Sequence, residues 1–186
     1  MSKAVIQGNA SGTGTFTVAA PNSNSNRTLT LPDNSGVLLS NATTAGFPAG
    51  SVLQVVYGST STQVANTTTT YTDTGLTATI TPTSATSKIL VLVTQSCYKT
   101  PSPTSAVNIK LFRGATDLGQ FIKDECYTGT TLANVSTAAF QKLDTPSTTS
   151  PTTYKTQFAN AASASSAIVQ VDNVGVSTIT LMEIAA

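Results

Sequence analysis

The sequence predicts an all-β protein, with a short N-terminal β-meander followed by a jelly-roll-like β-sandwich. The first observation is composition: 36 Thr and 21 Ser stand among 186 residues, and threonine, being β-branched, favours strands. The second is that only 9% of the residues are charged, against about 25% in an average globular protein. The third is a succession of short segments that alternate apolar and polar residues between turn signals.

Residues 1–45 are predicted to form a small β-element of three short strands. Those strands are expected at residues 14–20, 27–32 and 37–39. One face of the meander carries its apolar side chains: Phe16, Val18, Leu29, Leu31, Val37 and Leu39. Three short strands with so small an apolar face are marginal alone. We therefore expect this face to serve trimerisation or docking, covered by copies of the chain or by the main domain.

Residues 46–50 are predicted to be a linker because small residues, glycine and proline cluster there. Residues 51–186 are predicted to form the sandwich. Its strands are expected at 51–57, 70–73, 76–81, 88–98, 106–113, 117–123, 132–143, 153–158, 167–171 and 177–184. The turn signals between them recur at the spacing typical of sandwiches and jelly rolls. The continuous apolar run Ile89–Val93 predicts a central strand buried on both faces.

Charge and hydropathy argue against two classes of partner. The formal net charge is +1 without a basic stripe, so we expect no nucleic-acid partner. No apolar run approaches the ~18 residues of a membrane span, so we expect no membrane insertion. The first residues lack the apolar core of a signal peptide, and we expect the chain to be made in the cytoplasm.

The sequence offers little for catalysis, cofactors or metals, and we expect none of them. It contains no histidine, which removes Ser-His-Asp and Cys-His chemistry. A carboxylate pair such as Asp144 and Asp172 is the remaining route to glycoside hydrolysis, although acidic residues beside turn signals are more often turn residues. Cys97 and Cys126 are expected in the core or in strands, and the sequence leaves open whether they pair.

A ligand site, if the sandwich has one, is expected in its loops. Candidate residues are Lys99, Arg113, Asp124, Tyr127 and Asp144. Lys99, Arg113 and Asp124, with Lys123 and Glu125, are expected near one end of the sandwich. The alternatives are a solvated rim for the charges and a core or interface position for the tyrosine.

Residues Gly14–Leu39 resemble an element found in tail-fibre and capsid-fibre type virion proteins of tailed bacteriophages, especially aquatic ones. Several later stretches are similar to the β-domains that follow this element in such proteins. These stretches are Ser51–Val56, Lys88–Val91, Leu143–Pro146 leading to Thr153–Lys155, and Thr178–Ile184.

The resemblance implies a homotrimeric component of the virion, on the tail or the capsid surface, whose other partners are tail or capsid subunits. It implies a short fibre or fibre tip that attaches by its N-terminus and presents the sandwich to host surface polysaccharide. A capsid decoration or cement protein is the alternative, and a polysaccharide depolymerase a remote one. Long fibres usually have longer shafts than 186 residues allow.

Overall fold

A computed structural model describes residues 11–13, 47–163 and 165–186 of the chain. By its contacts the chain divides into two compact units, residues 1–38 and 39–186. The six residues of the predicted docking face, Phe16, Val18, Leu29, Leu31, Val37 and Leu39, lie outside the described residues.

The described part of the chain holds ten strands and one 3-10 helix. The strands are β1 (Val52–Thr60), β2 (Val64–Asn66), β3 (Thr72–Ile80), β4 (Lys88–Lys99), β5 (Val107–Arg113), β6 (Thr116–Glu125), β7 (Asn134–Asp144), β8 (Thr152–Asn160), β9 (Ala167–Val169) and β10 (Ser177–Ile184). The helix η1 (Val171–Asn173) lies between β9 and β10.

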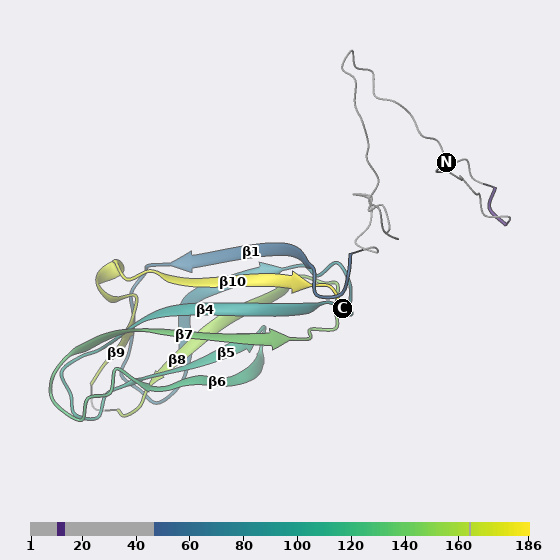
Figure 1. The fold of residues 1–186 in the computed structure, drawn as a ribbon. Coiled ribbons are helices and arrows are strands. Elements are labelled where there is room, and N and C mark those ends of the chain that lie inside the picture. Colours follow the sequence, from purple (N-terminus) through teal and green to yellow (C-terminus); the bar gives the residue numbers. More distant parts are fainter. Residues whose placement is uncertain (1–10, 14–46, 164) are drawn as a thin grey trace, which may run out of the picture. The chain divides into compact units, whose positions relative to one another are not determined.

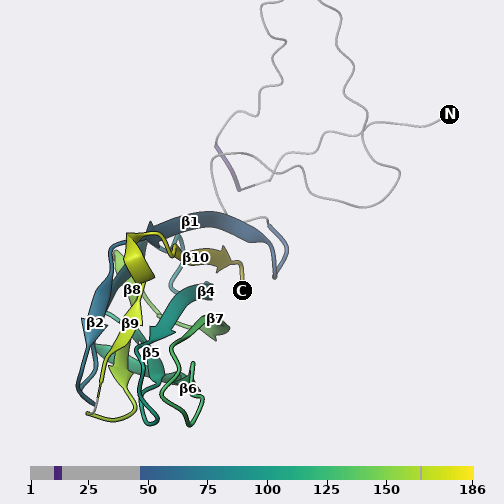
Figure 2. The same ribbon diagram turned by 90° about the vertical axis from the view of Figure 1, so that its left-hand side faces the viewer.

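Two antiparallel sheets form the sandwich, as Figures 1 and 2 show from two sides. The A sheet has the order β1-β10-β4-β7, and the short β9 and β2 extend it beside the second half of β4. The B sheet has the order β3-β8-β5-β6. Along the eight long strands the chain changes sheets at every connection except the β5–β6 hairpin. This is the double-sheet jelly roll, so the predicted fold class of residues 51–186 is confirmed.

The strand positions agree with the predicted ones where the alternating pattern is long. β10 begins and ends at the predicted residues. The two predicted strands at 70–73 and 76–81 are one strand, β3, whose register shifts between Asp73 and Thr77 around Gly75, at a φ of +83°. The three-residue β2 was not predicted, because a segment so short shows no period.

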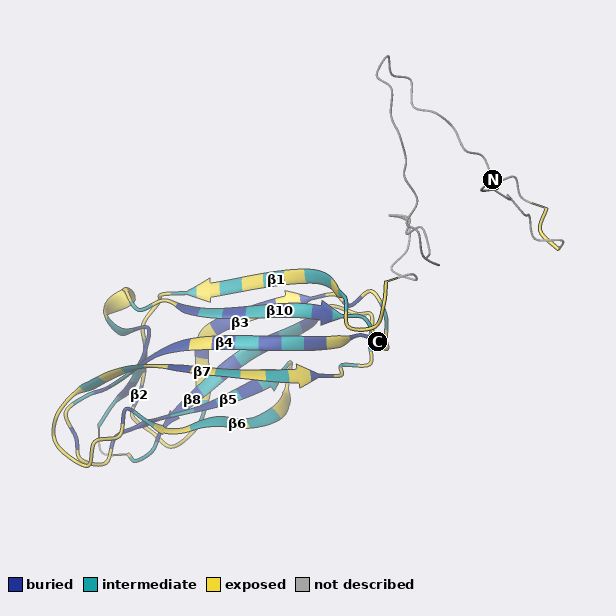
Figure 3. Cartoon of the chain, viewed as in Figure 1, coloured by how far each residue is buried: buried dark blue, intermediate teal, exposed yellow. Residues whose placement is uncertain are grey.

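β4 lies inside the A sheet, with β7 on one side and with β10 and then β9 on the other. Its alternating burial is visible in Figure 3. Ile89, Val91 and Val93 are buried against the B sheet, whereas Leu90 and Leu92 on the opposite face are half-buried. The prediction that this run is buried on both faces is therefore wrong. The A sheet has one face in the core, and nothing in the described part of the chain fully covers the other.

The core consists of two apolar clusters. One is built around Ile89, Leu111 and Tyr154, and the other around Cys97, Ile109 and Phe158. A buried polar layer contains Thr156 and Gln95. The Thr156 hydroxyl donates to Gln95 Oε1 at 3.0 Å. Gln95 Nε2 in turn donates to Ser177 Oγ at 2.8 Å. The hydrogen bonds offset the cost of removing these groups from water.

The sandwich has two ends, called here the near end and the far end, which differ in the loops they carry. At the near end the chain enters the sandwich: Gly50 N donates to the main-chain oxygen of Ala185 at 2.8 Å, and Ala185 N donates to Ser51 O at 2.9 Å. The β3–β4, β5–β6 and β7–β8 connections lie at this end, where Figure 1 marks the C-terminus. At the far end lie residues 67–71, 100–106, 126–133, 161–163 and 165–166.

Candidate functional site

The far end carries a pocket of about 320 Å³ lined by Thr104, Asp124, Tyr127 and Ala161. Its residues come from three places in the sequence: the β4–β5 loop, the end of β6 with the loop that follows it, and the residue after β8. Asp124 and Tyr127 are two of the predicted ligand-binding residues, and the tertiary structure brings Thr104 and Ala161 beside them. Thr104 and Ala161, which complete the lining, were not among the predicted residues.

The backbone at the end of β6 turns the Tyr127 ring outward. Asp124 and Cys126 adopt left-handed conformations, with φ of 56° and 66°. The turn is held by Asp124 N, which donates to Asn108 Oδ1 at 2.8 Å, and by Tyr127 N, which donates to Asp124 O at 3.2 Å. Non-glycine residues adopt positive φ rarely. The Tyr127 side chain is left 57% exposed.

Lys99 ties together two of the loops that form the pocket. It is fully buried at the end of β4, and its ammonium donates to Ser102 O at 2.7 Å, Thr128 Oγ1 at 2.5 Å and Thr130 O at 3.0 Å. An ammonium carries three donors, so these oxygens satisfy all of them. Lys99 was predicted as a ligand-binding residue. Its burial instead makes it a positioning residue for the loops that carry Thr104 and Tyr127.

The third side of the pocket is held by Asn160 at the end of β8. Its Oδ1 accepts from Ser105 Oγ at 3.0 Å and from Ala106 N at 3.2 Å, and its Nδ2 donates to Ser165 O at 2.7 Å. Asn160 is 1% exposed. The loop after β4 and the segment after β8 are therefore joined through one buried amide beside Ala161.

Arg113 and Asp144 lie at the near end, away from Lys99 and Asp124. Arg113 Nη1 donates to Asp144 Oδ2 at 2.7 Å, and the hydroxyl of Tyr154 donates to the same oxygen at 2.7 Å. Burial, and then the hydrogen bond to Asp144, raise the pKa of the Tyr154 phenol, so it stays protonated. The charged residues that were expected at one end of the sandwich therefore lie at both ends. The reason is that β5, which ends at Arg113, runs opposite to β4, which ends at Lys99.

The carboxylate pair of the depolymerase alternative is not assembled. In the A sheet Asp144 lies opposite Ile89 on the neighbouring strand, and Ile89 lies opposite Glu183 near the end of β10. Asp172 lies before β10 begins. The intervening part of β10 places the two carboxylates more than about 20 Å apart. Glycosidases hold their two carboxyl groups about 5 to 9.5 Å apart. Asp124 is the single acid among the residues that line the far-end pocket.

The two cysteines are free and buried. Burial, and then the charge interaction with Cys126, raise the pKa of the Cys97 thiol. Burial, and then the negative charge of Glu125, raise the pKa of the Cys126 thiol to about 11. Both thiols are therefore protonated at neutral pH and are poor nucleophiles. Across the ranges that the structure describes, no cluster of potential metal ligands is found. Within those same ranges no helix has the length and apolar character to cross a membrane.

The far-end pocket combines an exposed aromatic ring, a carboxylate and a hydroxyl. A tyrosine ring offers an apolar face on which a sugar ring can stack and a hydroxyl that can bind water or ligand. An ionised carboxylate accepts hydrogen bonds from ligand hydroxyls. Fold and site together define a jelly-roll protein with a polar pocket among the loops at one end of its sandwich.

No protein-family model matches the chain, and no curated protein matches it by sequence. Among solved structures, the VP2 subviral particle of infectious bursal disease virus is similar with a TM-score of 0.38 and 14% identity, over 82% of this chain and 42% of that one. The Gt strain of the same virus gives 0.38 and 12% over the same shares. Particles with T=1 derived from infectious bursal virus give 0.35 and 13%, over 82% and 41%. This chain thus spans about 42% of the first of these chains, and a likeness so distant assigns neither family nor function.

Proposed function

We propose that this chain is a non-enzymatic surface protein of a bacteriophage virion. It attaches through residues 1–45, self-associates as a homotrimeric short fibre or fibre tip, and presents the far end of its sandwich to polysaccharide on the host surface. The attachment and trimer elements of this proposal rest on the resemblance of Gly14–Leu39 to phage fibre proteins. The binding element rests on the structure of the far end.

The observation that carries the binding role is the exposed Tyr127 beside Asp124, in a pocket opposite the end at which the chain enters the sandwich. A receptor-binding site needs this placement, because the attached end faces the particle and the opposite end is free. The loops that form the pocket are held by the buried side chains of Lys99 and Asn160. A site whose geometry is fixed before binding loses less conformational entropy when it binds.

The test is binding of the full-length chain to an array of purified bacterial surface polysaccharides. We expect at least one polysaccharide to bind, and Tyr127→Ala to weaken that binding by about tenfold or more, since losing an aromatic stacking surface costs on the order of 1–2 kcal/mol. Leu132→Ala is the matched control, because Leu132 is 68% exposed in the same loop but does not line the pocket.

Two results would contradict the binding role: no polysaccharide retained at all, or Tyr127→Ala binding as well as the Leu132 control. Absence of binding together with loss of particle stability on removal of the protein would support the capsid-decoration alternative. Release of reducing ends from a bound polysaccharide would contradict the non-enzymatic assignment.

A further inference from the structure

The outward face of the A sheet carries an apolar row that crosses four strands. Val55 in β1 pairs with Met182 in β10, Met182 pairs with Leu90 in β4, and Leu90 pairs with Leu143 in β7. Paired residues lie on the same face of a sheet, so the four side chains form one continuous row. Val55 is 56% and Leu143 53% exposed.

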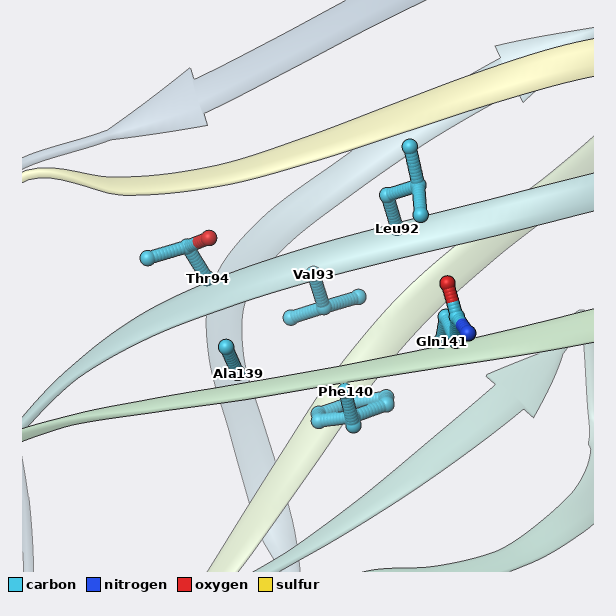
Figure 4. Close-up of a pocket in the computed structure, with 6 residues that line it drawn as sticks. All are labelled: Leu92, Val93, Thr94, Ala139, Phe140 and Gln141. Carbon is cyan, nitrogen blue, oxygen red and sulfur yellow. The ribbon is translucent and has the colours of Figure 1, made fainter.

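The next outward row continues this surface. It runs from Tyr57, which is 62% exposed, through Thr180 and Leu92 to Gln141. Beside it an open depression of about 410 Å³ lies between β4 and β7, and Figure 4 shows Leu92 and Gln141 among its lining residues. The two rows together hold six apolar side chains and the polar Thr180 and Gln141, and the surface is slightly hollowed at its middle.

The two outward faces of the sandwich differ in charge. Among the described outward residues of β1, β10, β4 and β7, Lys88 at the margin is the one charged side chain. The outward face of the B sheet instead carries the ion pairs Lys155–Asp73 and Lys110–Asp117. Exposed charges of both signs are typical of a solvated face, whereas an exposed apolar sheet surface is typical of an interaction site.

The size of the A-sheet face fits an interface between proteins. Its four strands, about 4.8 Å apart and about 30 Å long, outline roughly 600 Å² before side-chain relief is counted. A standard interface buries about 800 Å² on each partner. The absence of acidic groups also lets three copies of this face pack around a three-fold axis without opposing like charges, except for Lys88 at the margin.

We infer that the outward face of the A sheet is a surface through which copies of this chain associate. The inference rests on the self-association in the proposed function and gives it a location within the described sandwich, separate from residues 1–45. Burying the rows of Val55 and Tyr57 against neighbouring copies removes two large exposed apolar side chains of β1 from water.

The experiment measures the molar mass of the full-length chain by light scattering over a range of concentrations. The wild type is expected to be an oligomer. The double variant Val55→Lys/Leu143→Lys is expected to raise the dissociation constant by about tenfold or more, because each lysine brings a charge into an apolar interface. The control Thr79→Lys/Leu132→Lys adds the same charge at exposed sites off this face and is expected to match the wild type.

A second measurement covers the case in which the lysine variant does not fold. Thr180→Cys places a thiol in the middle of the face, and oxidation is expected to cross-link two chains, whereas Thr79→Cys on the B sheet is expected to stay uncross-linked. An oligomer that neither dissociates with the lysines nor cross-links through Thr180→Cys overturns this location but leaves self-association standing. A monomeric wild type overturns the self-association as well, and the polysaccharide array is unaffected by either outcome.

Discussion

Replacing Lys99 by methionine removes the ammonium that joins two far-end loops while keeping most of the side-chain stem. Three oxygens lose a donor: Ser102 O, Thr128 Oγ1 and Thr130 O. The Ser102 bond is buried, whereas the other two lie in partly buried surroundings. The variant therefore separates the loss of a tether from the loss of packing.

The size of the effect follows from two opposing contributions. Hydrogen bonds from a charged group contribute about 1.5–3 kcal/mol each, but burying an ammonium without a carboxylate costs several kcal/mol, and the variant recovers that cost. Water can reach the two partly buried oxygens, so the uncompensated loss is mainly the buried Ser102 carbonyl, worth about 1–3 kcal/mol. We expect Lys99→Met to lower the free energy of unfolding by about 1–3 kcal/mol.

Urea unfolding measures that loss, and amide hydrogen exchange locates it. Exchange is expected to accelerate in residues 100–106 and 126–133, and polysaccharide binding to weaken. Lys123→Met is the matched control, since Lys123 is 78% exposed and lies 3.9 Å from Asp124; surface changes of this kind stay within about 0.5 kcal/mol. If Lys99→Met matches this control in both stability and exchange, the Lys99 ammonium does not hold the two loops together.

Two further predictions concern the near end and the contact between β1 and β3. Burial by itself raises the pKa of the Glu183 carboxyl, but hydrogen bonds from Gln54 and Thr83 outweigh burial and hold it below its ordinary value of 4.5. Ser87 Oγ is buried near the Glu183 carboxyl but makes no hydrogen bond of ordinary geometry, so it is not one of these donors. The stability that Glu183 contributes is therefore complete above pH 4.5 and is lost as the pH falls through its lower folded-state pKa. In urea unfolding between pH 6 and 3, the free energy of unfolding of Glu183→Gln should fall less with acid than that of the wild type. An equal fall in the two proteins would refute this. At Gly58 an added Cβ would lie 2.2 Å from Thr77 O, so Gly58→Ala should lower the free energy of unfolding by about 1–3 kcal/mol, measured against the exposed Ser59→Ala; equal stability of the two variants would contradict the close contact.

The alternating strands were predictable because their pattern repeats over many residues. β10 was placed at its observed ends, and β5 and β8 within two residues. β3 was divided because Gly75, which resembles a turn signal, lies at an irregularity inside one strand. β2 was missed because its three residues pair only with β9, far away in the sequence.

The candidate site was predictable in part. Asp124 was named as one of the charged residues expected at one end of the sandwich and Tyr127 as a loop tyrosine, and the two line one pocket. The burial of Lys99 was not predictable, since a lysine is buried only where the fold supplies acceptors, here the oxygens of loops that follow different strands. The pairing of Arg113 with Asp144 depends in the same way on two strands from different sheets.

The sequence by itself determined that the main domain is a sandwich of short strands, because period-two alternation and turn residues act within a few neighbouring positions. It also limited the chemistry, since a chain without histidine lacks the usual general base. Only the tertiary structure decided which end each loop occupies, which cation is buried, and that one outward sheet face is almost free of charge while the other carries ion pairs. These properties depend on strand order and register, and pairing between distant segments sets both.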